Sequence, residues 1–213
     1  MTPDCLEELN KAYQDETIGF VYSDVAINKE DFIPYKSSHG WTHYNYEYQG
    51  KNLYVMNTWE PTSHSLSFIW YAPDHVRSWR TSVYKNLGGH NVDLSICDDH
   101  ELMIRTYLST KMYHISKPLY VYRVYGENTY LERNAQIQTK TVELQRQYAY
   151  QLAERDAELR GLLKVDMGGG LFPRSGYLTI DQEGADITCD LNDGIPLEDN
   201  SVGVLNASHV MNT

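Results

Sequence analysis

The chain has 213 residues, 41% of them hydrophobic, and a formal net charge of −11 at pH 7. This length and apolar content suffice for one large or two small domains, each with a buried core. The negative charge argues against nucleic acid or an anionic membrane as the main partner, because acidic surfaces repel phosphate groups, and no apolar run is long enough to span a membrane.

Targeting and cysteine patterns point to the cytoplasm. The N-terminus lacks the charged-then-apolar pattern of a signal peptide. The three cysteines, Cys5, Cys97 and Cys189, are odd in number and far apart, so they indicate neither a disulfide framework nor a zinc site with paired ligands. We therefore expect the protein to work in a reducing, cytoplasmic compartment.

The first predicted elements are an amphipathic helix over residues 3–14 and a buried strand over residues 18–25. The strand is apolar until Ser23 and Asp24. Ligands of sheet-based enzymes commonly lie at the carboxyl ends of strands, so Asp24 is a candidate ligand-binding residue. The alternative is that Asp24 caps a turn.

An aromatic hairpin is predicted next. Tyr44, Tyr46 and Tyr48 alternate with polar residues, and residues 49–52 suit a turn before the second strand. Aromatic rings can pack on the C–H faces of sugars and keep a polar group in water. Trp41, Tyr44 and Tyr46 are therefore candidates for an acceptor-binding surface, although cross-strand packing would explain the same pattern.

The following region predicts a strand over residues 65–71, a short helix over residues 76–86 and a turn with positive φ at Gly88 and Gly89. Further on, residues 113–124 predict a strand interrupted at Lys117-Pro118.

Residues 97–108 join an acidic cluster to an apolar, helix-forming run, which is typical of a helix N-terminus. Asp98 fits the N-cap position, and Glu101 completes a capping-box pattern. Asp99 is not needed for capping. Desolvation at the mouth of a cleft can raise the pKa of such a carboxylate, which suits a general base. Asp99, with Asp98 beside it, is therefore a candidate catalytic residue; the alternative is an ordinary acidic first turn.

The C-terminal third begins with a long polar helix over residues 138–159, ended by Gly161. A buried strand then runs through Asp166 into the glycine turn of residues 168–170, where a backbone can approach a ligand closely. Two more strands end near acids, Asp181 and Asp190. A carboxylate at such a position can accept hydrogen bonds from ribose hydroxyls.

Four blocks within residues 1–135 resemble, in order, the C-terminal half of the family 2 glycosyltransferases. They are the helix of residues 3–14 with the strand ending Val21-Tyr22-Ser23-Asp24, the Gly88-Gly89 turn, the helix Asp98-Asp99-His100-Glu101-Leu102-Met103-Ile104-Arg105, and the strand Pro118-Leu119-Tyr120-Val121-Tyr122-Arg123. The resemblance implies a GT-A-like mixed sheet with helices. It also implies that Asp99 deprotonates an acceptor hydroxyl and that Arg123 lies at the substrate site. Asp98 would have an orienting or helix-capping role beside Asp99.

The same resemblance implies a missing donor half. In this family the nucleotide-sugar binds an N-terminal βαβ region with a DxD-type metal site, and no Asp-x-Asp precedes Asp24. Tyr125 stands where the family often carries a metal-binding histidine, and a phenol replaces imidazole poorly. We expect the complete glycosyltransferase to use Mn²⁺ or Mg²⁺, at a site not evident here, and a second polypeptide to supply the donor half.

Residues 162–213 resemble the opening of class I S-adenosylmethionine-dependent methyltransferases. The matching features are the D-x-G-x-G turn from Asp166 to Gly170, the acid Asp181 on the second strand, and Ile195-Pro196-Leu197-Glu198-Asp199-Asn200-Ser201 with Ala207-Ser208-His209-Val210. The resemblance implies that Gly168, Gly169 and Gly170 contact the methionine part, Asp181 the ribose and Asp190 the adenine. The segment between Gly170 and Tyr177 is too short for a full crossover helix, and later strands of such a domain are absent.

The sequence therefore predicts an α/β protein of three regions: a glycosyltransferase-like acceptor half over residues 1–135, a bridging helix over residues 136–161 and a partial, Rossmann-like methyltransferase segment over residues 162–213. The expected function is transfer of a sugar, with inversion, from a nucleotide-sugar to a glycan acceptor hydroxyl. The alternatives are a non-catalytic glycan- or protein-binding module, and an S-adenosylmethionine-dependent methyltransferase module with the front half as scaffold.

Overall fold

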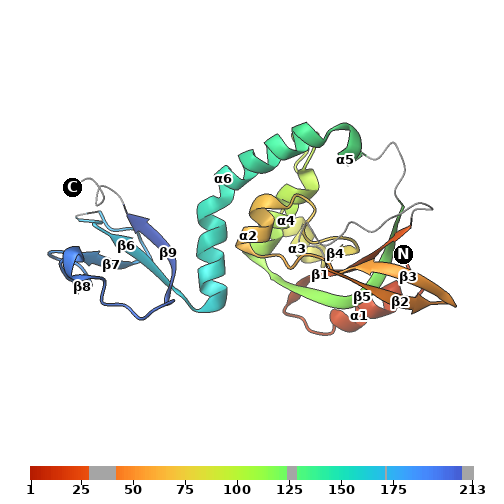
Figure 1. Cartoon of the computed structure of the whole chain (residues 1–213), viewed down its shortest axis with the longest axis horizontal. Coiled ribbons are helices and arrows are strands. Elements are labelled where there is room, and N and C mark those ends of the chain that lie inside the picture. The colour runs from red at the N-terminus through yellow and green to blue at the C-terminus, as the bar shows by residue number, and fades with distance from the viewer. Residues whose placement is uncertain (29–41, 124–128, 171, 208–213) are drawn as a thin grey trace. The chain divides into compact units, whose positions relative to one another are not determined.

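The computed structural model describes residues 1–28, 42–123, 129–170 and 172–207 (Figure 1). The fold is mixed α/β, as predicted. The chain divides into two compact units, Met1–Tyr148 (unit 1) and Ala149–Thr213 (unit 2). In the described part of the chain, no helix combines the length and the apolarity that crossing a lipid bilayer requires.

The sheet of unit 1 is built around β1 (Ile18–Asn28). β5 (Lys111–Arg123) runs parallel to β1 along its length, whereas β3 (Lys51–Met56) and β4 (Arg77–Trp79) pair with it antiparallel, and β2 (His43–Tyr48) pairs with β3. The two faces of β1 are covered by different helices (Figure 1). Val21 packs with α1 (Cys5–Ala12), and Phe20 contacts Trp79, whose indole nitrogen donates to Thr106 of α4 (Asp98–Ser109).

Two polar residues lie in the middle of β1 because its neighbour changes there. Residues 20–22 pair with β4, and residues 25 and 26 pair with β3. Between these pairings, the Ser23 hydroxyl accepts from the Val76 backbone N–H at 3.0 Å and donates to the Asp24 carbonyl at 2.9 Å. Asp24 is four residues from the end of β1, so the prediction that it ends the strand is wrong.

The tyrosine hairpin is confirmed. On β2, Tyr44, Tyr46 and Tyr48 form the half-buried face, and the residues between them are exposed. A two-residue turn joins β2 to β3, with φ of 50° at Gln49 and 71° at Gly50. Positive φ at both central residues matches the twist of a tight hairpin.

Local capping explains one wrong prediction, the strand over residues 65–71. The structure instead has α2 (Ser63–Phe68), begun by a capping box in which the Ser65 N–H donates to the Thr62 hydroxyl at 3.1 Å and the Thr62 N–H donates to the Ser65 hydroxyl at 2.9 Å. These bonds satisfy N–H groups at the helix start and outweigh the apolar pattern of a short run. The predicted helix over residues 76–86 is divided into β4 and α3 (Thr81–Asn86).

The start of α4 also differs from the prediction. The N-cap is Cys97, in the left-handed region at φ 58° and without a side-chain cap, and Asp98 is the first helical residue. The predicted capping box of Asp98 and Glu101 is therefore wrong. Leu102, Met103 and Ile104 are fully buried and anchor the helix in the core.

The helices after β5 are α5 (Thr129–Glu132) and α6 (Asn134–Arg160), which begins four residues before the predicted start. Gly161, at φ 65°, ends α6 as predicted. The Leu162 N–H donates to the Ala157 carbonyl at 2.8 Å and the Gly161 N–H to the Glu158 carbonyl at 3.2 Å, which is a Schellman motif.

Unit 2 contains a parallel sheet in the order β8-β7-β6-β9. Its elements are β6 (Leu163–Met167), β7 (Leu178–Asp181), β8 (Ile187–Thr188), the 3₁₀ helix η2 (Leu191–Asp193) and β9 (Val202–Ala207). Two apolar clusters stabilise it: Ala157 packs with Tyr177 and Val204, and Val165 packs with Met167 and Ile180.

Candidate functional site

The first turn of α4 carries Asp99, whose carboxylate is held by an arginine from β4. Arg77 Nη1 donates to Asp99 Oδ2 at 2.6 Å, and Arg77 also donates to the carbonyls of Pro73 at 2.8 Å and Tyr71 at 3.0 Å. The Arg77 side chain is 6% exposed and the Asp99 side chain 38%. A fixed guanidinium therefore presents a carboxylate that solvent can still reach.

The pKa of Asp99 lies below its ordinary value. Burial alone would raise this pKa, but the charge of Arg77, its hydrogen bond and a second hydrogen bond from the His100 N–H at 2.9 Å outweigh burial. The expectation of a raised pKa is wrong, because sequence alone does not place Arg77 beside Asp99. Asp98 has a different partner: its Oδ2 lies 2.9 Å from His90 Nδ1.

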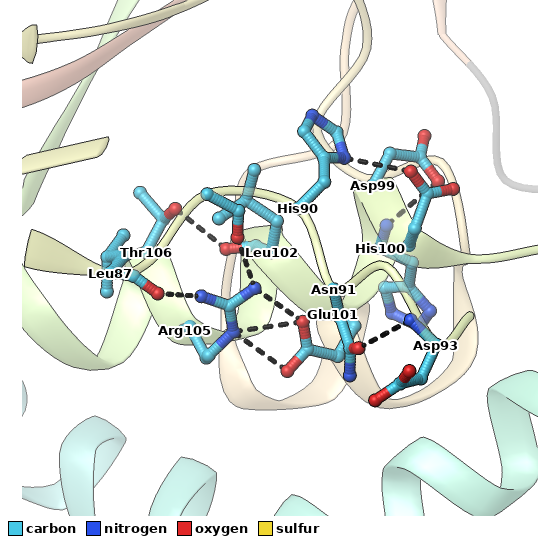
Figure 2. Close-up of polar contacts among 12 residues, drawn as sticks. Leu87, His90, Asn91, Asp93, Asp99, His100, Glu101, Leu102, Arg105 and Thr106 are labelled. Atoms are coloured by element: carbon cyan, nitrogen blue, oxygen red, sulfur yellow. Dashed lines mark hydrogen bonds and ion pairs between the residues drawn. The ribbon is translucent and has the colours of Figure 1, made fainter. Parts of the chain in front are cut away.

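Glu101 lies in the same first turn of α4 and forms a part-buried clamp with Arg105, one turn further along the helix (Figure 2). Arg105 Nε lies 2.8 and 2.9 Å from the two Glu101 oxygens, and Arg105 Nη2 donates to Glu101 Oε2 at 2.6 Å. Arg105 also donates to the carbonyls of Leu87 and Gly89. The clamp thereby fixes the Gly88-Gly89 turn, which has the positive φ predicted for it.

Glu101 has a second donor in Tyr148, whose hydroxyl donates to Oε1 at 2.7 Å. Burial would raise the pKa of Glu101, which is 5% exposed, but the bonds from Arg105 and Tyr148 lower it below its ordinary value. Burial and the bond to Glu101 raise the pKa of Tyr148 to about 12. This carboxylate is ionised, fully partnered and structural.

A cavity of about 280 Å³ adjoins the fixed turn. It is lined by Leu87, Gly88, Gly89, His90, Asn91, Glu101 and Arg105. Asp99 is not among these residues, so the carboxylate lies on the same helix turn as the cavity wall without forming part of that wall.

The second candidate cluster surrounds Asp24. Its Oδ2 accepts from the Tyr44 hydroxyl at 2.9 Å, and its Oδ1 accepts from the Thr58 N–H at 3.1 Å and lies 2.9 Å from His114 Nε2. Burial opposes ionisation of Asp24, which is 1% exposed, but these bonds hold its pKa below the ordinary value. The predicted residues Asp24 and Tyr44 thus contact each other. Together with His114, they connect β1, β2 and β5.

The remaining predicted residues of the acceptor surface are Tyr46, Arg123 and Trp41. Tyr46 lies on the half-buried face of β2. Arg123 is the last residue of β5, in register with Asn28. Trp41 lies outside the described residues.

Sequence reasoning missed Asp74, in the loop before β4. The Asp74 N–H donates to the Thr58 hydroxyl at 2.6 Å, but Asp74 Oδ2 is buried without a hydrogen-bond partner among the described residues. Burial, with the nearby charge of Asp24, raises the pKa of Asp74 to about 7, although Arg77 opposes the shift. The sequence signal, Pro73-Asp74, indicated only a turn.

In unit 2 the predicted cofactor residues gather at the carboxyl ends of β6 and β7. The glycine turn has φ of 68° at Gly168 and 52° at Gly170, and the Gly170 N–H donates to Asp181 Oδ2 at 3.2 Å. Asp166, 2% exposed, accepts from the Arg174 N–H at 2.7 Å and the Asn206 side chain at 2.6 Å. A Cβ at Gly169 would lie 2.8 Å from Asp166 Oδ2, so a larger residue there would require the Asp166 carboxylate to shift.

The Asp190 carboxylate accepts hydrogen bonds from a residue close to it in the chain. Its Oδ1 accepts from the backbone and the side chain of Asn192, both at 2.9 Å, and so caps η2.

Other residues that shape these clusters, such as Arg77, Thr58 and His114, gave no sequence signal. The exception is Arg105, because glutamate and arginine four residues apart on a helix favour a pair. Within the residues that the structure describes, no three His, Cys, Asp or Glu side chains gather in a way that could hold a metal ion.

Comparison of the chain with models of known protein families, with curated proteins and with solved structures found no match.

Proposed function

We propose that unit 1 is the acceptor side of an inverting glycosyltransferase, with Asp99 as the base. The acceptor oxygen forms a bond to the anomeric carbon of a nucleotide-sugar, the bond from that carbon to the nucleotide phosphate breaks, and Asp99 takes the hydroxyl proton. One observation carries the proposal: Asp99 is ionised, held by Arg77 and still 38% exposed. A low pKa keeps the base deprotonated, although it weakens the driving force for proton transfer.

The surrounding residues act as positioning groups in this proposal. Arg77 is held by the carbonyls of Pro73 and Tyr71 and fixes the Asp99 carboxylate through one hydrogen bond. The clamp of Arg105 fixes the Gly88-Gly89 turn, so that the adjacent cavity keeps its shape when a saccharide binds. In this proposal a second polypeptide supplies the nucleotide-binding part.

A binding and transfer experiment tests the proposal. We expect calorimetry to show binding of neutral saccharides but not of nucleotide-sugars with Mn²⁺. In the complete native polypeptide or complex, Asp99→Asn should reduce sugar transfer by a factor of about 10² or more while saccharide affinity is kept, because a general base contributes about 10²–10⁴. Product formation is measured by mass spectrometry.

The matched control is Asp93→Asn, which removes an exposed carboxylate from the loop that precedes α4. Unchanged transfer by Asp99→Asn would exclude Asp99 as the base. Saccharide binding without transfer in the complete protein would instead favour a non-catalytic glycan-binding module. Tight binding of a nucleotide-sugar by unit 1 would contradict the assignment as an acceptor half.

A second candidate function, S-adenosylmethionine binding, is favoured by the strand order of unit 2. In parallel sheets, ligands bind beyond the carboxyl ends of strands where the strand order reverses, and β6 lies between β7 and β9. The glycine turn would approach the methionine part of S-adenosylmethionine. Asp181 would accept hydrogen bonds from its ribose hydroxyls. The bound cofactor would supply an electrophilic methyl group.

We expect calorimetry to detect S-adenosylmethionine binding that Asp181→Ala weakens by about tenfold or more, because a hydrogen bond to a charged group contributes about 1.5–3 kcal/mol. Asp193→Ala, an exposed carboxylate on η2, is the control and should bind as the unaltered protein does. Circular dichroism checks that the loss of the bond from Gly170 has not unfolded the loop. Equal affinity in both variants would rule out this role for Asp181.

A further inference from the structure

A second cavity, of about 550 Å³, lies in unit 2 where β6 and β9 begin. Its lining residues are Leu163, Pro196, Leu197, Glu198, Asp199 and Ser201. Leu163 opens β6, and its N–H donates at 2.8 Å to the carbonyl of Ser201, the residue before β9. Because these strands are parallel, the cavity lies at the opposite edge of the sheet from the glycine turn of residues 168–170.

The lining divides into an apolar and an anionic part. Leu163, Pro196 and Leu197 supply hydrocarbon surface, and the exposed Glu198 and Asp199 supply two negative charges. The cations near the lining residues in the sequence are already paired. Lys164 Nζ, next to Leu163, lies 3.1 Å from Glu158, Arg160 Nη1 lies 3.3 Å from Asp156, and Arg174 Nη2, the last cation before Glu198, lies 3.3 Å from Glu154. Among the described residues of unit 2, no ion pair neutralises Glu198 or Asp199.

Ser201 adds an unsatisfied polar atom to the same wall. Its backbone N–H donates to the Glu198 carbonyl at 3.2 Å, and its carbonyl accepts from Leu163. Its hydroxyl oxygen, however, is buried and has no hydrogen-bond partner in the described part of the chain. A buried hydroxyl without a partner costs free energy, so a ligand that supplies a donor is favoured here.

We propose that this cavity binds an alkyl guanidinium or alkyl ammonium group. The cation would lie between the two carboxylates and the Ser201 hydroxyl, where charge-assisted hydrogen bonds are strongest. The hydrocarbon stem would cover Leu163, Pro196 and Leu197, as the stems of arginine and lysine cover apolar surface elsewhere. The cavity volume is in the usual range for small-molecule sites. A free amine and a basic side chain of a partner protein share this chemistry.

Amide NMR titration of the whole chain with agmatine tests the proposal. We expect shifts confined to residue 163 and residues 197–202, and none with butylurea, which keeps a similar stem but has no charge. The double variant Glu198→Gln/Asp199→Asn should weaken binding at least tenfold, and Ser201→Ala should weaken it severalfold without lowering Tm. The charge-matched control Glu183→Gln/Asp193→Asn, which alters exposed residues outside the cavity, should bind normally.

A parallel titration with the peptide acetyl-Gly-Arg-Gly-amide distinguishes the two sources. Tighter binding of the peptide than of agmatine would assign the site to a basic segment of a partner, and weaker binding would assign it to a free amine. Absence of shifts at these amides, or equal shifts with butylurea, would overturn the proposal. Equal weakening by the control double variant would overturn it too, because the effect would then follow from net charge alone.

Discussion

Asp74→Asn is expected to stabilise unit 1 at pH 8 but not at pH 4. Burial raises the pKa of the Asp74 carboxyl to about 7, against an ordinary value of 3.8. The folded state therefore holds a proton that the unfolded state releases, so stability falls as pH rises from about 4 to about 7 and then levels off. Three pKa units correspond to about 4 kcal/mol. Asparagine cannot ionise, so the variant avoids this loss.

The measurement is thermal unfolding followed by tryptophan fluorescence between pH 4 and pH 8. All four tryptophans precede residue 80, so the signal reports unit 1 alone. The difference in Tm between variant and unaltered protein should grow with pH and reach several degrees above pH 7. The new amide at the unpartnered Oδ2 position can add a constant offset, but it cannot add a pH dependence. A difference in Tm that does not change with pH would contradict a raised pKa at Asp74.

Arg105→Ala is expected to destabilise unit 1 strongly. It would leave Glu101, only 5% exposed, as a buried charge without its cation, and it would release the carbonyls of Leu87 and Gly89. Removing one partner of a buried ion pair costs about 3–5 kcal/mol. At about 2–4 °C per kcal/mol for a chain of this size, Tm should fall by roughly 10 °C.

A double-mutant cycle separates the pair from the rest of the site. Adding Glu101→Leu to Arg105→Ala should recover part of the loss, because the stranded charge is then gone. Lys11→Ala, which breaks an exposed pair with Glu7 on α1, should change Tm little. If Arg105→Ala is as mild as Lys11→Ala, the clamp is not a main support of the Gly88-Gly89 turn.

Patterns within a few residues predicted most local structure correctly. Alternating tyrosines and a turn-forming pair gave the hairpin of β2 and β3, and Gly161 gave the end of α6. Local reasoning was wrong where side-chain hydrogen bonds compete with an apolar pattern, as at Thr62 and Ser65, which begin a helix where a strand was predicted.

The candidate sites were harder to predict because their partners are distant in the sequence. Arg77 lies 22 residues from Asp99, and His114 lies 90 residues from Asp24. Both partners lower the pKa of a carboxylate, the opposite of the raised pKa expected for Asp99. Among the residues that the structure describes, Asp74 has the one carboxyl whose pKa is strongly raised. This shift depends on burial in a loop whose sequence resembles an ordinary surface turn.

The position of β1 also determines how unit 1 can open. Every other strand of its sheet is bonded to β1 directly or, for β2, through β3. Peripheral strands can separate one at a time, but β1 cannot leave without breaking the ladders on both sides. Its central amides should therefore exchange with deuterium only when the whole unit unfolds, whereas those of β2 should exchange through local fraying.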